Sequence, residues 1–196
     1  MGRPASFDHA EILETIQTLF WDKGYAATSL DDIMASTGLG KGSLYAAYGA
    51  KEDMYLLAFT DYCDWAVENA KERLLGDDEG AFARLRKYVQ TSAKGAATSR
   101  RGCMLAKGTA ELRGRFPEVD KVIEKTFKAL EGAILECVCQ AQRAGEIEPN
   151  RDPKMLAATI LAAARGMEAL GVAGASSASL SLVAQGVLSL LTPARR

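Results

Sequence analysis

The chain has 196 residues, 48% of them hydrophobic, and a formal net charge of −1 at pH 7. It can therefore bury a core, and its many alanines and leucines, with few β-branched runs, favour an all-helical protein. The charge balance excludes a broadly basic surface for nucleic acid. No apolar stretch spans a bilayer, and the four cysteines lack CxxC pairing, so we expect a cytoplasmic protein with free thiols and no membrane partner.

The first predicted helix begins at His9, directly after Asp8, and ends at Gly24. Its apolar residues recur at helical spacing and cover one face. We expect this helix to be the scaffold for the segment that follows. The apolar positions are Ile12, Leu13, Ile16, Leu19 and Phe20.

Residues 28–51 predict two short helices joined by a tight turn, with Thr28 or Ser29 as the cap of the first helix, residues 30–36. Gly38 lies where a helix-turn-helix requires a residue that tolerates positive φ. The second helix begins near Gly40. Its first residues are a cation, a hydroxyl, an aromatic hydroxyl and a glycine that permits close approach, which suit phosphates and base edges in a major groove. These residues are Lys41, Gly42, Ser43 and Tyr45.

This segment resembles the DNA-binding domain of the TetR family of bacterial transcriptional regulators. The shared frame is TGLGKGSLY at residues 37–45, followed by Tyr48, Lys51 and Glu52. The resemblance implies that Thr28, Ser29, Lys41, Gly42, Ser43, Tyr45, Tyr48 and Lys51 form the contacts to a double-stranded DNA operator. Gly40 replaces the usual serine cap, and Ala46 and Ala47 replace larger residues, so fewer side chains reach outward.

The predicted head is acidic, because its carboxylates outnumber its lysines and arginines. We therefore expect modest non-specific DNA affinity. The same observation keeps an alternative open, in which the chain is a helical ligand-binding or protein-binding module that does not control DNA.

The remaining helices are expected at about residues 52–75, 81–97, 103–112, 118–144, 153–172 and 177–191, which gives about nine in total. We expect a DNA-binding domain at residues 1–51 and an effector-binding and dimerisation domain at residues 52–196. In the last helix one apolar stripe faces its own body, while Leu182 and Leu190 add apolar surface elsewhere. This surplus predicts a homodimer through the last two helices.

The stretch RGCMLAKGTAEL at residues 101–112, preceded by Arg100, places Cys103 at a helix start beside the two arginines Arg100 and Arg101. The dipole and the cations both favour a reactive thiolate. The stretch also resembles a Gly-Cys-Leu-Leu segment of TetR proteins that include electrophile and oxidant sensors. The alternative is that Cys103 is a small packing residue.

Several large side chains of the body are either plain core or, as the TetR resemblance implies, the lining of a small-molecule effector site. Arg165, in an apolar helix, is its candidate polar anchor or part of an ion pair with Glu168. The chain shows no phosphate loop, nucleophile elbow, metal-ligand cluster or cofactor motif, so we expect a regulator, most simply a repressor, and no enzyme. The candidate effector residues are Trp65, Tyr88, Cys103, Met104, Phe127, Arg165 and Met167.

Overall fold

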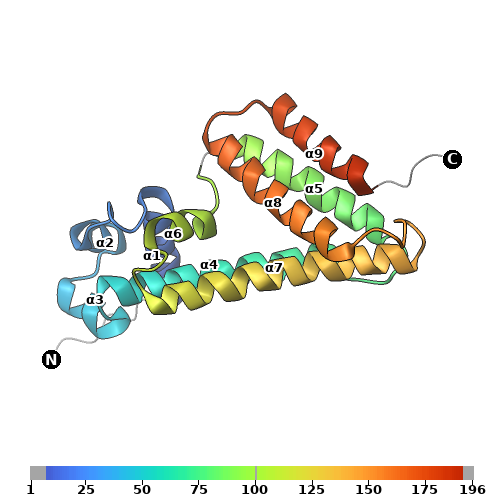
Figure 1. Ribbon diagram of the computed structural model, residues 1–196. Helices are drawn as coiled ribbons and strands as arrows, with labels where there is room; N and C mark the ends of the chain where they lie inside the picture. The colour runs from blue at the N-terminus through green and yellow to red at the C-terminus, as the bar shows by residue number, and fades with distance from the viewer. Residues whose placement is uncertain (1–7, 100, 192–196) are drawn as a thin grey trace. The chain divides into compact units, whose positions relative to one another are not determined.

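The computed structural model describes residues 8–99 and 101–191, and within them the chain forms nine α-helices and no strand (Figure 1). The all-helical prediction is confirmed, and the helix ends lie within one or two residues of those expected. The helices are α1 (His9–Lys23), α2 (Leu30–Thr37), α3 (Lys41–Tyr48), α4 (Lys51–Leu74), α5 (Ala81–Thr98), α6 (Met104–Leu112), α7 (Pro117–Arg143), α8 (Pro153–Val172) and α9 (Ser177–Leu191).

The chain divides into two compact units. The head comprises the described residues of 1–63 and 104–123, and the body those of 64–103 and 124–196. The head therefore contains α6 as well as α1 to α3. The functional division expected after Lys51 stays a prediction, because these units are defined by packing alone.

In the head, α1 packs against α2, and α2 packs against α3. The Asp8 side chain caps α1 by accepting the Ala10 N–H at 2.9 Å, and Gly24 ends the helix with a φ of 83°. Ile16 and Phe20 of α1 are buried with Ile33 of α2. The apolar stripe of α1 is thus the scaffold under the two shorter helices.

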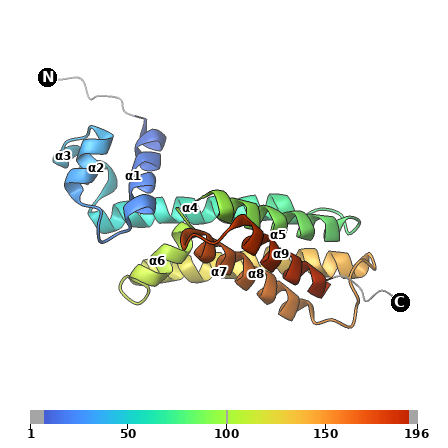
Figure 2. The ribbon, with the colours of Figure 1, turned by 90° about the horizontal axis from the view of Figure 1, so that it is seen from above.

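In the body, α5, α8 and α9 pack against one another and lie side by side (Figures 1 and 2). Gly171 permits the closest approach, because a Cβ there would lie 2.1 Å from the Ala96 carbonyl oxygen of α5. Among the described residues α8 is the only helix long and apolar enough to cross a membrane. Leu156, Ile160 and Met167 of this helix are buried, so its apolar composition also fits a helix that packs in the core of the body.

Candidate functional site

Helix α2 and the turn after it are fixed by local hydrogen bonds. Ser29 caps α2 in a reciprocal capping box: the Asp32 N–H donates to Ser29 Oγ at 3.0 Å, and the Ser29 N–H donates to Asp32 Oδ2 at 2.8 Å. Gly38 adopts the left-handed conformation at φ 70°, and its N–H donates to the Met34 carbonyl. The turn thus brings α3 across α2, as a helix-turn-helix requires.

Helix α3 divides into a buried side and an exposed side. Leu44 and Tyr48 are buried, whereas Lys41, Ser43 and Tyr45 are exposed, and no acidic residue occurs in the helix. The Lys41 ammonium lies 5.9 Å from the Tyr45 ring centroid. The exposed side therefore presents a cation, two hydroxyls and, at Gly42, bare backbone in two turns of helix.

Two of the expected DNA contacts have buried side chains. Thr28 is fully buried, and its hydroxyl donates to the Gly24 carbonyl at 2.7 Å. The Tyr48 hydroxyl lies 3.1 Å from His9 Nδ1, and burial raises the pKa of Tyr48. Both hydroxyls thus hold the head together and are not presented to a phosphate.

Lys51 is the first residue of α4, and its ammonium lies 4.4 Å from the centroid of the Tyr25 ring. This cation–π contact restrains the side chain. Asp53 accepts the Ala50 N–H at 2.8 Å and so fixes the start of the helix. Lys51 is therefore held at a defined position on the head, half-exposed.

One carboxylate of the helix-turn-helix is held in an ion pair. Lys23 and Asp32 form an ion pair at 2.6 Å, and the hydrogen bonds from Lys23 and Ser29 hold the pKa of Asp32 well below its usual range. One of the two carboxylates in the first turn of α2 is thereby neutralised. Because the pair cancels one cation together with one anion, the net acidic balance of the head stays as the sequence indicates.

The sequence did not identify the contacts that fasten α6 to the rest of the head. Glu111 accepts the Tyr25 N–H at 2.8 Å and the Ala26 N–H at 2.5 Å, and Lys107 donates to the Trp21 carbonyl at 2.8 Å. Gly108 lies where a Cβ would approach the Tyr55 hydroxyl to 2.6 Å. Helix α6 therefore contacts both the end of α1 and the loop that leads into α2.

In the body, side chains from α5, α8 and the segment before α6 form a polar cluster. Arg165 Nη1 donates to Cys103 Sγ at 3.1 Å, and Arg165 Nη2 pairs with Glu168 Oε1 at 3.1 Å. Tyr88 lies in the same electrostatic environment, and burial raises its pKa. Burial also raises the pKa of Glu168, against the opposing effect of Arg165. Arg100, one of the two arginines expected beside Cys103, lies outside the residues that the structure describes. We name Tyr88, Cys103, Arg165 and Glu168 the polar cluster.

The other candidate effector residues are placed differently. Met167 is buried in α8, and Met104 is buried at the start of α6, in the head unit. Phe127 is half-buried on α7. Trp65 is 56% exposed, so in the single chain it lies on the surface and lines no interior site. Its large apolar side chain gave no indication of which face of α4 it occupies.

Two family models match the chain. Residues 12–58 match the model for bacterial regulatory proteins of the tetR family, and residues 81–186 match the model of the tetracyclin repressor-like C-terminal domain. The second match alone spans more than half of the chain.

Known relatives agree with this result over nearly the whole chain. The HTH-type transcriptional repressor ComR of Escherichia coli strain K12 is 28% identical over 192 residues, which cover 96% of this chain and 91% of ComR.

Two solved structures share the fold. A TetR transcriptional regulator from Chloroflexus aurantiacus J-10-FL has a TM-score of 0.81 at 24% identity and covers 92% of this chain and 91% of its own. A cysteine mutant of the TetR family regulator CifR, complexed with 26-bp operator DNA, has a TM-score of 0.76 at 23% identity, covering 97% and 100%. These proteins are transcriptional regulators and not enzymes. This chain belongs to the TetR family of DNA-binding, helix-turn-helix transcriptional regulators.

Proposed function

We propose that this regulator is a cytoplasmic repressor that binds a palindromic operator as a homodimer and releases it when a small apolar or electrophilic effector reaches the body. Residues 1–51 read DNA, and residues 52–196 bind the effector and the second copy. The observation that carries the proposal is the exposed side of α3, where Lys41, Ser43 and Tyr45 lie together with no carboxylate in the helix.

The DNA contacts divide by chemistry. Tyr45 and Lys51 suit phosphates, since one offers a phenolic hydroxyl and the other a restrained ammonium. Lys41, Gly42 and Ser43 lie in the first turn of α3, where a recognition helix meets base edges. Ser29 is exposed at the positive end of α2, where its hydroxyl donates to Asp32 Oδ2 at 2.8 Å, so a phosphate contact would replace that bond. Thr28 and Tyr48 support this surface from beneath.

The dimer forms through the exposed faces of α8 and α9. On α8 these are Ala158, Ala162 and Gly166, small residues at helical spacing that permit close approach. On α9 Leu182 is 67% exposed and Leu190 is exposed as well. A twofold interface of this kind sets two α3 helices about 34–36 Å apart for successive major grooves.

The polar cluster is the effector site. Arg165 can orient a polar group of the effector, and its guanidinium donates to the buried Cys103 sulfur that an electrophile would modify. Tyr88 and Met167 supply aromatic and apolar surface. A buried ligand or a bulky adduct changes the packing in this region of the body.

Helix α6 follows Cys103 directly in the chain. A shift of Cys103 displaces Met104 and the rest of α6, because a helix moves as a rigid element. Glu111 and Lys107 then carry the displacement to the end of α1 and the loop before α2. Complete release requires the effector to favour the released state by roughly 5.5 kcal/mol.

The proposal is tested by gel retardation of DNA from upstream of the chain's own gene, with and without unlabelled competitor. A specific shift that Lys41→Ala weakens supports it, whereas Lys87→Ala on the exposed side of α5 serves as the matched control. Equal binding to unrelated DNA at all salt concentrations would show that no operator is read. Effectors are then screened by their ability to release the shifted band.

A further inference from the structure

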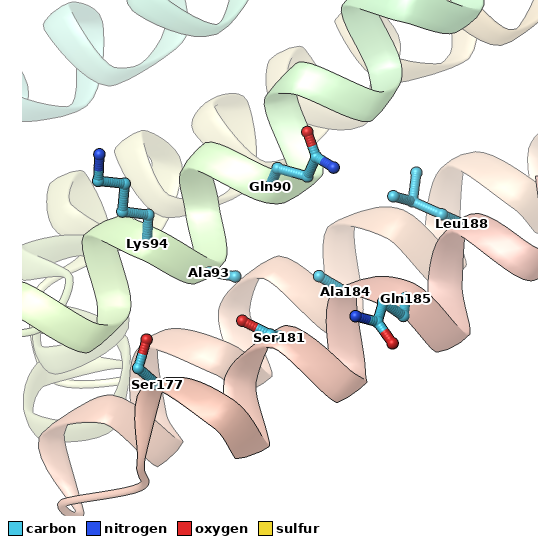
Figure 3. A pocket seen from close by; sticks show the side chains of 8 residues that line it. All are labelled: Gln90, Ala93, Lys94, Ser177, Ser181, Ala184, Gln185 and Leu188. Carbon is cyan, nitrogen blue, oxygen red and sulfur yellow. The ribbon is translucent and has the colours of Figure 1, made fainter.

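A groove of about 390 Å³ lies between α5 and α9 of the body (Figure 3). Its lining residues include none of the four residues of the polar cluster. This volume falls within the range of small-molecule sites. Ala93 and Ala184 are buried at its floor, and their short side chains create the space between the helices. The groove is lined by Gln90, Ala93, Lys94, Ser177, Ser181, Ala184, Gln185 and Leu188.

The charge in the groove has one sign. Among the described residues that line it, Lys94 is the one that carries a charge. Helix α5 contains arginines and lysines but no aspartate or glutamate, and α9 contains no charged residue. In the described residues, 8–99 and 101–191, no carboxylate forms an ion pair with Lys94. A ligand in the groove can therefore meet this one positive charge only at the exposed edge, where the Lys94 ammonium lies (Figure 3).

The polar side chains of the groove keep their hydrogen-bonding capacity. Elsewhere on these two helices, the hydroxyls of Thr91, Ser92 and Ser189 donate to carbonyls of their own helix. Within the part of the chain that the structure describes, Ser177 and Ser181 make no such bond. The side-chain amides of Gln90 and Gln185 likewise form no hydrogen bond within the described residues. Hydroxyl and amide groups of both helices therefore border the groove, while the Lys94 ammonium lies at its exposed edge and points away from α9 (Figure 3).

These properties define the class of ligand. One lysine matches a single negative charge, whereas a phosphate monoester carries close to two and is better matched by several cations or an arginine fork. The neutral donors suit carboxylate oxygens, while Leu188 and the alanine floor suit a short apolar body. We propose that the α5–α9 groove binds a small amphipathic carboxylate, independently of the effector site proposed above.

The test uses the full-length protein without DNA and sodium hexanoate as the probe. Binding is followed by the side-chain amide NMR signals of Gln90 and Gln185 and by calorimetry. Hexanol and hexylammonium have the same apolar body without the negative charge, and inorganic phosphate tests the anion alone. We expect saturable shifts of both amides with hexanoate and at least tenfold weaker binding of the other three probes.

Variants locate the site. Lys94→Gln removes the charge from an exposed position, and we expect it to weaken hexanoate binding about tenfold, while Lys87→Gln on the same helix leaves binding unchanged. Glu168→Gln also leaves it unchanged, since the polar cluster takes no part. Equal binding of hexanol, an unaffected Lys94→Gln variant, or loss of binding in Glu168→Gln would each overturn the proposal. None of these outcomes bears on operator binding.

Discussion

The carboxylate of Glu111 accepts the backbone N–H of Tyr25 at 2.8 Å, although 86 residues separate them in the chain. Gly24 makes this approach possible, because it adopts a φ of 83° and a Cβ there would lie 3.0 Å from Glu111 Oε2. The loop before α2 is thus held by a side chain of α6. The helix that begins next to Cys103 therefore fixes the loop that leads into the helix-turn-helix.

Replacing Glu111 should loosen the loop that precedes the helix-turn-helix. Glu111→Ala removes two charge-assisted hydrogen bonds, and we expect a loss of about 1–3 kcal/mol in the free energy of unfolding. Operator affinity should fall as well, because α2 and α3 lose a fixed attachment. Urea denaturation and fluorescence anisotropy measure the two effects. Glu118→Ala, in an exposed ion pair with Lys121, is the control, and equal behaviour of both variants would rule out the positioning role.

The local parts of the head could be predicted from sequence because their partners are neighbours. Ser29 and Asp32 are three residues apart, and Gly38 ends α2 through its own conformation. The Glu111 contact could not be predicted, because its geometry depends on how α6 packs in three dimensions. The same limit applies to Tyr48: the TetR frame marks it as a contact, but helical position alone did not show that its hydroxyl faces His9.

Lys51 should contribute to DNA affinity without contributing to sequence preference. Lys51→Met keeps apolar contact with Tyr25 but removes the charge, so we expect weaker binding to all sequences and a salt slope smaller by about 1. The salt dependence of anisotropy measures this slope. Lys71→Met, in the last turn of α4, is the matched control. An unchanged slope for Lys51→Met would remove Lys51 from the phosphate contacts.

Ser43 makes the opposite prediction, since a hydroxyl in the first turn of α3 carries little charge but can reach a base edge. Ser43→Ala should change the preferred operator sequence and leave the salt slope unaltered. Selection of binding sites from a random DNA pool compares the two proteins. Identical selected sequences would show that Ser43 does not read bases.

Leu182, which is more exposed than Leu190, tests the proposed dimer face of α9. Leu182→Glu should give monomers in light scattering, because a carboxylate would be buried at the twofold interface. Leu188 lines the α5–α9 groove, so it is a poorer position than Leu182 for a substitution that disrupts the dimer. Leu57→Glu is the control, because Leu57 is an exposed leucine on α4, outside the proposed interface. Dimers of Leu182→Glu would require another interface.

Glu168 should make stability fall as pH rises. Burial raises its pKa above the ordinary value of 4.5, so the folded state holds a proton that the unfolded state has already released. The unfolding free energy contributed by this group is present below about pH 4.5 and is lost as pH rises through the folded-state pKa. Glu168→Gln cannot titrate. The urea midpoint of the parent should fall relative to that of Glu168→Gln as pH rises through this range. A difference between the two midpoints that does not change with pH would contradict the assignment.

The body was predictable in a different way from the head. Helical spacing identified the inward stripe of α9 and the surplus Leu182, and Tyr88, Cys103 and Arg165 do share one region. Size and aromatic character could not place Trp65, because an apolar side chain on a long helix fits a core, a ligand site or an exposed interface equally. Only the orientation of α4 decides between them.

The last prediction separates two ways of releasing the operator. If modification of Cys103 is the trigger, Cys103→Ser should bind operator normally and ignore electrophiles, because the hydroxyl is a poor nucleophile where the thiolate is a good one. Cys137 is the matched control: burial raises its pKa to about 11, so it stays a thiol at neutral pH, and Cys137→Ser should respond as the parent does. Gel retardation with N-ethylmaleimide or a quinone measures release. If both the parent and Cys103→Ser release DNA on treatment, Cys103 is eliminated as the trigger, and the more exposed Cys139 or ligand binding beside Tyr88 and Arg165 is left as the route to induction.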